Sequence, residues 1–190
     1  LHDRVQQAAY SLIPEEEKQA THYRIGQLLR QEMSLDATEE RIFELTNQLN
    51  RGISLISTQD EREALAQLNL AACRKAKAAI AYQAGLAYAK IGLQLLGDQA
   101  WHAQYDMALS FHNLTAELAA FCGDMPSLEN SFSAILKQTH EPLKQASVYR
   151  IKTLLQTSRN ELAEAIVTAK ESLAGFGLRL PDSPTFQDIQ

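Results

Sequence analysis

Apolar residues recur with a helical period along most of this 190-residue chain. Apolar positions three and four residues apart lie on one face of an α-helix, whereas a half-buried strand alternates with a period of two. The periodic segments predict nine helices, over residues 2–12, 14–33, 37–50, 60–79, 81–96, 100–122, 125–139, 142–157 and 160–175. The tail, residues 178–190, has no such period and is typical of a turn-rich exit segment.

Many of the predicted helix ends carry residues that satisfy unpaired backbone groups. Three pairs have capping-box spacing, with an acid three residues after the cap: Asp36–Glu39, Thr58–Glu61 and Ser158–Glu161. Prolines suited to a first helical turn are Pro14, which precedes three glutamates, Pro126 and Pro142. Glycines that follow periodic runs, where a left-handed residue is favoured, are Gly97, Gly123 and Gly177.

Three predicted helical segments repeat one another by residue type. They are residues 82–93, 125–136 and 162–173, and each is expected to be the second helix of a pair. In the first and third segments small residues stand at matching offsets, namely Gly85, Ala89 and Gly92 in one and Ala165, Ala169 and Ser172 in the other. Small side chains along one stripe let a neighbouring helix approach closely, which predicts stacked antiparallel helix pairs.

The segment YQAGLAYAKIGLQLLG, residues 82–97, resembles the second helix of a tetratricopeptide repeat, with Cys73 and Ala76 at packing positions of the first helix. The resemblance extends over residues 57–177 and implies an all-α fold of antiparallel helix pairs stacked as a right-handed superhelix, an α-α solenoid. The equivalent positions Gly85, Leu128 and Ala165 are 43 and 37 residues apart, whereas the family repeats about every 34 residues. Leu128 also stands where a small residue is expected, so the repeats are degenerate.

The amino-terminal third resembles a different family. HDRVQQAAYSLIPEEEKQATHYRIGQLL, residues 2–29, is similar to the end of the winged-helix part of signal-transduction ATPases with numerous domains, with the signature residues His22, Ile25, Gly26 and Leu29. ERIFELTNQLNRG, residues 40–52, resembles the region after the ATPase in very large bacterial, especially cyanobacterial, signalling kinases. The resemblance implies that residues 1–56 follow a winged-helix/ATPase module, in a parent chain with Ser/Thr or histidine kinase domains.

Composition and charge favour a cytoplasmic helical protein. The net charge of −5 argues against nucleic acid as a partner, and the basic run Arg74, Lys75 and Lys77 is expected to be a solvated helix face. The two cysteines, Cys73 and Cys122, lie in apolar helical patterns and are expected to be small buried residues in a reducing compartment. The apolar runs are far shorter than the roughly 18 residues that span a bilayer, so no membrane insertion is expected.

The sequence contains no motif that indicates ATPase, hydrolase or kinase chemistry. It has no P-loop, nucleophile elbow or kinase catalytic motif, and no two of its five histidines stand three or four residues apart. We therefore expect no enzyme activity, cofactor or metal in this chain. His102 and Asp106 are one helical turn apart but are expected to be surface residues, and His22 is expected to be a packed or capped structural residue.

Aromatic residues at helical spacing have two interpretations. They could form a ligand cage, but we expect them to fill space between stacked helices; they are Tyr82, Tyr88, Trp101, Tyr105, Phe111, Phe121 and Phe132. Trp101 follows a predicted turn, where it either pins the next helix pair or lines a groove. These aromatics therefore support the packed array more than a binding cage.

These observations predict a non-catalytic protein-interaction and regulatory scaffold within a larger signal-transduction ATPase/kinase. Its expected partners are proteins or neighbouring domains of the same chain, and the apolar surface of an end repeat could also support a homodimer. Because the chain starts without Met and at full periodicity, we expect it to be a piece of a longer protein.

Two alternatives stay open. The resemblance implies that His2 senses nucleotide phosphates in an adjacent ATPase site, although taken alone a histidine there is expected to be a helix-capping or frayed residue. The other alternative is a small-molecule sensor, which would need a substantial apolar pocket with convergent polar groups.

Overall fold

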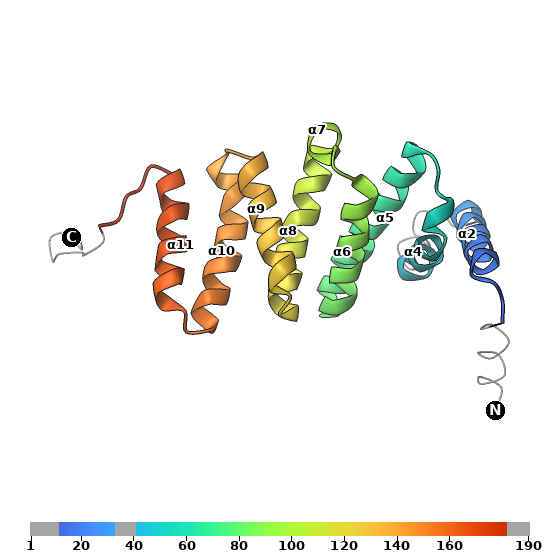
Figure 1. Cartoon of the computed structure of the whole chain (residues 1–190), viewed down its shortest axis with the longest axis horizontal. Helices are drawn as coiled ribbons and strands as arrows, with labels where there is room; N and C mark the ends of the chain where they lie inside the picture. Colours follow the sequence, from blue (N-terminus) through green and yellow to red (C-terminus); the bar gives the residue numbers. More distant parts are fainter. Residues whose placement is uncertain (1–11, 33–40, 182–190) are drawn as a thin grey trace, which may run out of the picture. The chain divides into compact units, whose positions relative to one another are not determined.

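In the computed structural model, which describes residues 12–32 and 41–181, every regular element is a helix (Figure 1). These ranges contain nine α-helices and one short 3-10 helix, so the all-α prediction is confirmed for them. The Asp36–Glu39 cap and the helix predicted over 2–12, apart from its last residue, lie outside the described residues. Among the helices described, none is both long and apolar enough to cross a membrane.

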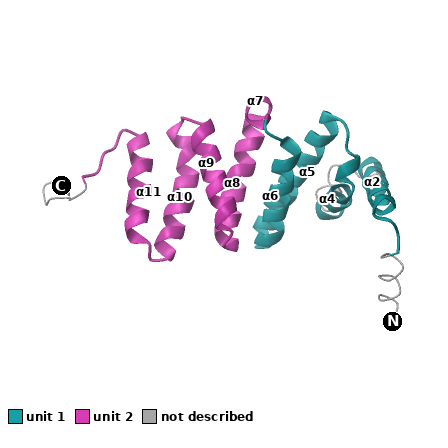
Figure 2. Ribbon diagram, in the orientation of Figure 1, with its two compact units in different colours: residues 1–98 teal, residues 99–190 magenta. Residues whose placement is uncertain are grey.

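The chain divides into two compact units, Leu1–Asp98 and Gln99–Gln190 (Figure 2). Within each unit, helices that follow one another in the sequence pack against each other. The predicted regions differ from these units: 1–56 and 57–177 are divided by sequence resemblance and 178–190 by its lack of a helical period. They stay a prediction.

In its described residues, 12–32 and 41–98, unit 1 contains two packed helix pairs joined by a 3-10 turn. Its elements are α2 (Glu15–Glu32), α4 (Ile42–Arg51), η1 (Ile53–Leu55), α5 (Gln59–Ala78) and α6 (Tyr82–Leu96). The Thr58 hydroxyl accepts a hydrogen bond from the Glu61 amide at 3.3 Å, and the Glu61 carboxylate accepts one from the Thr58 amide at 3.4 Å. The predicted capping box at the start of α5 is therefore confirmed.

As far as residue 181, where its description ends, unit 2 contains five helices: α7 (Ala100–Ala103), α8 (Tyr105–Cys122), α9 (Met125–Gln138), α10 (Pro142–Ser158) and α11 (Leu162–Gly175). The single helix predicted over 100–122 is wrong, because Gln104 has φ −144° and ψ 52° and separates α7 from α8. That backbone is far from the helical region near −63° and −42°. The break lets Trp101 pack on Tyr105 and His112 of α8.

Small residues bring α5 and α6 close together. Ala66, Ala72 and Cys73 on α5 are fully buried, and Ala89 on α6 is buried to the same extent. Gly85 lies on the same buried face of α6. A stripe without long side chains lets the two backbones approach, as the small-residue pattern predicts.

One turn geometry recurs in three helix hairpins. The left-handed residue is Ile80 between α5 and α6, Gly123 between α8 and α9, and Asn160 between α10 and α11, with φ of 61°, 72° and 62°. In each turn the next amide donates a 2.9 Å hydrogen bond back to the preceding helix; the acceptors are the carbonyls of Ala76, Ala119 and Gln156. This is the bonding of a Schellman C-cap.

The turns share the register of the sequence repeat. Residues 80, 123 and 160 are 43 and 37 apart, the same spacings as Gly85, Leu128 and Ala165. Each of these last three residues lies five positions after its left-handed residue and is buried. The degenerate repeat therefore corresponds to a recurring helix hairpin.

The last predicted capping box, Ser158–Glu161, is wrong. Ser158 is the final residue of α10, and its hydroxyl donates to the Leu155 carbonyl at 2.7 Å. The side chain of Glu161, which precedes α11, makes no cap hydrogen bond. Asn160 takes the left-handed position here. Ser158 therefore belongs to the end of α10, although its spacing to Glu161 predicts the start of a helix. By contrast, Pro126 and Pro142 do lie in the first turns of α9 and α10.

Candidate binding groove

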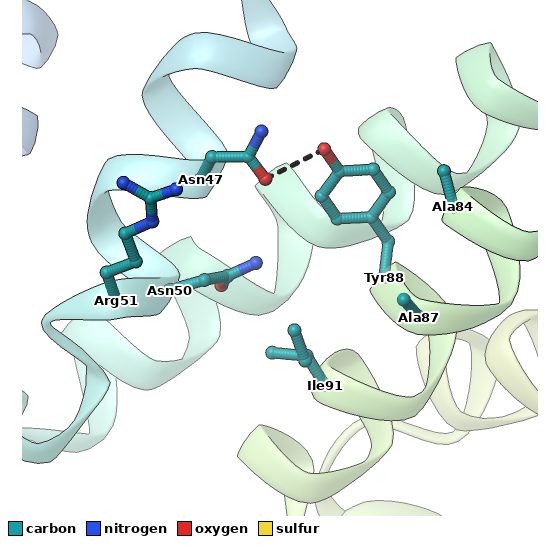
Figure 3. Close-up of a pocket in the computed structure, with 7 residues that line it drawn as sticks. All are labelled: Asn47, Asn50, Arg51, Ala84, Ala87, Tyr88 and Ile91. Atoms are coloured by element: carbon teal, nitrogen blue, oxygen red, sulfur yellow. Dashed lines mark hydrogen bonds between the residues drawn. The ribbon is translucent and has the colours of Figure 1, made fainter. Parts of the chain in front are cut away.

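A groove of about 460 Å³ lies between α4 and α6 of unit 1 (Figure 3). Figure 3 shows polar side chains from α4 on one wall and mainly apolar side chains from α6 on the other. The lining residues are Asn47, Asn50 and Arg51 from α4, and Ala84, Ala87, Tyr88 and Ile91 from α6. Four of these seven residues are exposed, so the groove is open along its length.

The polar wall follows from the amphipathic pattern of α4. Ile42, Leu45 and Leu49 are at most 4% exposed and hold the helix against its neighbours. Asn47, Asn50 and Arg51 are three and four residues apart, so they share another face of the helix. The buried face of α4 thus fixes which polar side chains point into the groove.

Tyr88 sets the orientation of the Asn47 side chain. The Tyr88 hydroxyl donates a 2.9 Å hydrogen bond to Oδ1 of Asn47, which leaves both amide hydrogens of Asn47 on the open side (Figure 3). The Tyr88 ring is 8% exposed and stacks on Phe43 with 5.9 Å between the centroids. Burial raises the pKa of Tyr88, so its hydroxyl stays protonated and donating at neutral pH.

Asn50 is held by a second, fully buried amide. Asn50 and Asn69 of α5 exchange two hydrogen bonds of 2.9 Å, and Asn69 also donates to the Leu65 carbonyl at 2.9 Å. Asn69 has no exposed surface, so its amide depends on these partners for its hydrogen bonds. The exchange leaves one hydrogen of the Asn50 amide for a ligand.

The groove presents more hydrogen-bond donors than acceptors. Asn47 offers two N–H groups and Asn50 one, and the Arg51 guanidinium adds donors and a positive charge. Arg51 is exposed, and no described residue forms an ion pair with it. Such an arrangement suits a ligand with carbonyl or carboxylate oxygens.

Close packing of α2 on α4 supports the polar wall. Gly26 of α2 lies directly against the Leu49 side chain, and a Cβ on Gly52 would come within 2.9 Å of the Tyr23 Cα. His22 is 9% exposed, and its Nδ1 lies 2.6 Å from Oε1 of Gln48. The prediction of His22 as a packed structural residue is confirmed, and two of the four signature residues, His22 and Gly26, contact α4.

Tyr23 also ties α2 to the start of α5. Its hydroxyl donates a 2.6 Å hydrogen bond to the Glu61 carboxylate, the acid of the capping box. This bond raises the pKa of Tyr23 and lowers the pKa of Glu61, because it favours the protonated phenol and the charged carboxylate. One carboxylate therefore caps α5 and contacts α2.

Unit 2 has a polar cluster of another kind at α7 and α8. The His112 ring stacks on Trp101 with 5.1 Å between centroids and 12° between planes, and its Nδ1 lies 3.4 Å from the Ser131 hydroxyl. Burial lowers the pKa of His112 to about 4, so the imidazole is neutral at neutral pH. Trp101 therefore pins α7 onto α8, which is one of its two predicted roles.

A second hollow, of about 270 Å³, lies between α8 and α10 of unit 2. Its walls are largely apolar, with Phe121 and Leu154 each more than half exposed. The charged residues that line this hollow are Glu117 and Arg150.

Other predicted residues are placed as follows. Cys73 is buried and Cys122 is half-buried, and neither forms a disulfide. Arg74 and Lys75 are exposed, as expected for a solvated face, while Lys77 is half-buried. The Lys75 ammonium lies 5.7 Å from the Phe43 ring centroid.

His102 and Asp106 stand on opposite sides of the Gln104 break, on α7 and α8, and their side chains are not hydrogen-bonded to each other. His2 lies outside the described residues. Among the residues that are described, no three His, Cys, Asp or Glu side chains form a group that could hold a metal ion.

The predicted aromatic packing holds for most of the set. Phe111, Phe132 and Tyr88 are at most 8% exposed, whereas Phe121 is 58% exposed. Phe121 is the exception because it stands in the last turn of α8, beside the hollow.

Of the groove residues the sequence singles out only Tyr88, as an aromatic that either packs between helices or joins a ligand cage, and it does not predict the groove itself. Its two walls are separated in the sequence by the whole of α5, and no local motif joins them. The available signal was the spacing of Asn47, Asn50 and Arg51, which places three polar side chains on one face of an amphipathic helix.

Comparison with known proteins relates the chain to part of a large signalling histidine kinase. A relative is hybrid signal transduction histidine kinase G of Dictyostelium discoideum, which is 33% identical to this chain over 136 residues. The match covers 59% of this chain and 4% of that protein's length. No protein-family model and no solved structure matches the sequence.

Proposed function

We propose that this chain is a non-catalytic protein-interaction and regulatory scaffold within a larger signal-transduction ATPase/kinase. Its helix hairpins would be degenerate tetratricopeptide-like repeats, and its partners would be proteins or neighbouring domains of the same parent chain. The histidine kinase relative supports a signalling context. The nucleotide-sensing role of His2 belongs to the parent ATPase and stays a separate prediction.

The open groove of unit 1 is the observation that carries this proposal. Its donors are oriented by partners inside the protein, Tyr88 for Asn47 and Asn69 for Asn50, so little side-chain entropy is lost on binding. Enclosed small-molecule sites bury most of their ligand. A groove with four exposed lining residues is better suited to a segment of protein.

The hairpins supply the rigidity that a scaffold needs. Their Schellman turns recur with the same bonds, and the α5–α6 interface is packed with small side chains. Binding to a rigid surface avoids the cost of ordering loops. The same rigidity would allow a change at one helix pair to reach its neighbour through packing.

Two measurements on the purified chain test the proposal. Calorimetric titration with Mg-ATP and a phosphate-release assay should detect neither binding nor hydrolysis. The tagged chain is cross-linked to its partners in an extract of the cells that make the protein, and excess untagged chain should prevent the capture of at least one of them. That protein, once purified, should bind the chain saturably. ATP turnover by the chain, or no saturable partner, would contradict the proposal.

A further inference from the structure

The hydrogen-bonding groups that line the groove between α4 and α6 determine which ligand fits it. Asn47 and Asn50 have their amide oxygens engaged, by Tyr88 and by Asn69 respectively. What they offer to a ligand is therefore mainly N–H groups, which need acceptors. The carbonyl oxygens of an extended peptide main chain meet this need, and an extended chain fits an open groove.

Arg51 adds a requirement for negative charge. It is one turn from Asn47 on the same helix, and Figure 3 shows it on the same wall of the groove. A guanidinium matches a carboxylate with two parallel hydrogen bonds. Among the described residues no other cationic side chain lines the groove, so one carboxylate matches its charge.

The opposite wall is suited to an apolar side chain. Ala84 and Ala87 are exposed, Ile91 is half-buried, and the buried Tyr88 ring adds an aromatic surface beside them. An aliphatic side chain next to the carboxylate would cover this wall. The net charge of −5 does not oppose this fit, because charges beyond about 8 Å are largely screened at physiological salt.

We infer that this groove binds an extended peptide segment with an Asp or Glu carboxylate on Arg51, main-chain carbonyls on Asn47 and Asn50, and a neighbouring aliphatic side chain on Ala84, Ala87 and Ile91. The inference rests on the proposed function and gives the chemical class of the partner segment.

A random heptapeptide library displayed on phage, panned on the full chain at physiological salt, tests it. The enriched peptides should share an Asp or Glu beside an aliphatic residue. Fluorescence anisotropy then measures the affinity of the best peptide and of its matched amide form, with Asp or Glu changed to Asn or Gln. The acidic form should bind about tenfold more tightly, as expected for one charge-assisted hydrogen bond.

Variants assign the peptide to the groove. Arg51→Gln should weaken the acidic peptide about tenfold and remove the preference over the amide form. Ala87→Glu, on the opposite wall, should also weaken it because it places a competing carboxylate in the groove. Arg24→Gln is the matched control, because it removes the same charge from an exposed position on α2 and should leave affinity unchanged. Thermal melts confirm that each variant is folded.

No enrichment, enriched peptides without an acid, or equal binding to wild type and Arg51→Gln would each overturn the inference. These results leave the proposed function standing as long as the chain keeps a saturable partner and does not turn over ATP. Loss of that partner defeats the proposed function itself, so the two failures are distinguishable.

Discussion

The two units differ in the polar contact that each forms between its helices. In unit 1 the fully buried Asn69 meets another amide, that of Asn50, and neither group changes charge with pH. In unit 2 the half-buried His112 stacks on Trp101, and its pKa is lowered to about 4, so its charge does change with pH. Similar helix packing therefore holds a pair of amides in one unit and an imidazole in the other, and only the imidazole changes its charge with pH.

The hollows of the two units differ in the polarity of their lining residues. The groove of unit 1 is lined by oriented amides and a guanidinium, whereas that of unit 2 is lined mainly by Phe121, Ile151, Leu154 and Leu155. The first can select for acceptors and charge, while the second offers mainly apolar area. Selective recognition is therefore expected in unit 1.

Acid should destabilise unit 2 through His112. In the unfolded chain a histidine takes up a proton near pH 6.5, but the folded His112 does so only near pH 4. The unfolded state therefore binds more protons between these values, and stability falls as pH falls. The loss is about 3 kcal/mol by pH 4. Urea unfolding followed by the fluorescence of Trp101, the chain's single tryptophan, measures it.

His112→Phe is the matched variant, because it keeps a planar ring beneath Trp101 but cannot take up a proton. Its stability should change much less between pH 6.5 and 4. If the variant and the wild type lose the same free energy over this range, His112 is not the source of the acid sensitivity.

Gly52→Ala should strongly destabilise unit 1. A Cβ at Gly52 meets the Cβ and the backbone of Tyr23, and backbone cannot move aside as a flexible side chain does. The overpacking should cost about 2 kcal/mol. Gly175→Ala in unit 2 is the control, because its Cβ would meet Pro142 at an ordinary 3.5 Å. Urea melts should show a large loss for the first variant and none for the second; similar losses would contradict the close approach of α2 and α4.

Asn50→Ala should cost about 1 to 2 kcal/mol, because it leaves the fully buried Asn69 without its main partner. Asn130→Ala, at an exposed site on α9, should stay within about 0.5 kcal/mol of wild type. Thermal unfolding followed by circular dichroism compares the two. Equal effects would mean that the amide pair adds nothing to unit 1.

Ile80→Gly should stabilise unit 1 by about 1 kcal/mol. Ile80 has φ of 61°, which is strained for a β-branched residue, and it is 71% exposed, so little packing is lost. Asn160→Gly, at the equivalent turn of unit 2, should gain only a few tenths of a kcal/mol because Asn tolerates this conformation. The difference in melting temperature between the two variants measures the strain, and equal shifts would contradict it.

These comparisons also show what the sequence could predict. The start of α5 was predictable because Thr58 and Glu61 cap it locally, and the starts of α9 and α10 because of their prolines. The break at Gln104 was not, since it lacks glycine or proline and is accompanied by the packing of Trp101. The capping box predicted at Ser158 was wrong because the left-handed Asn160 follows the end of α10, so Ser158 ends that helix. The groove required the pairing of α4 with α6, which local patterns do not encode.

Nuclear magnetic resonance of the ¹⁵N-labelled chain, titrated with the peptide selected on it, tests the central claim most directly. If the peptide lies between α4 and α6, the side-chain amide signals of Asn47 and Asn50 should shift with saturation, along with backbone signals of these two helices. Signals near Phe121 and Leu154 should stay in place. Saturable shifts confined to α8 and α10, with Asn47 and Asn50 unmoved, would contradict it.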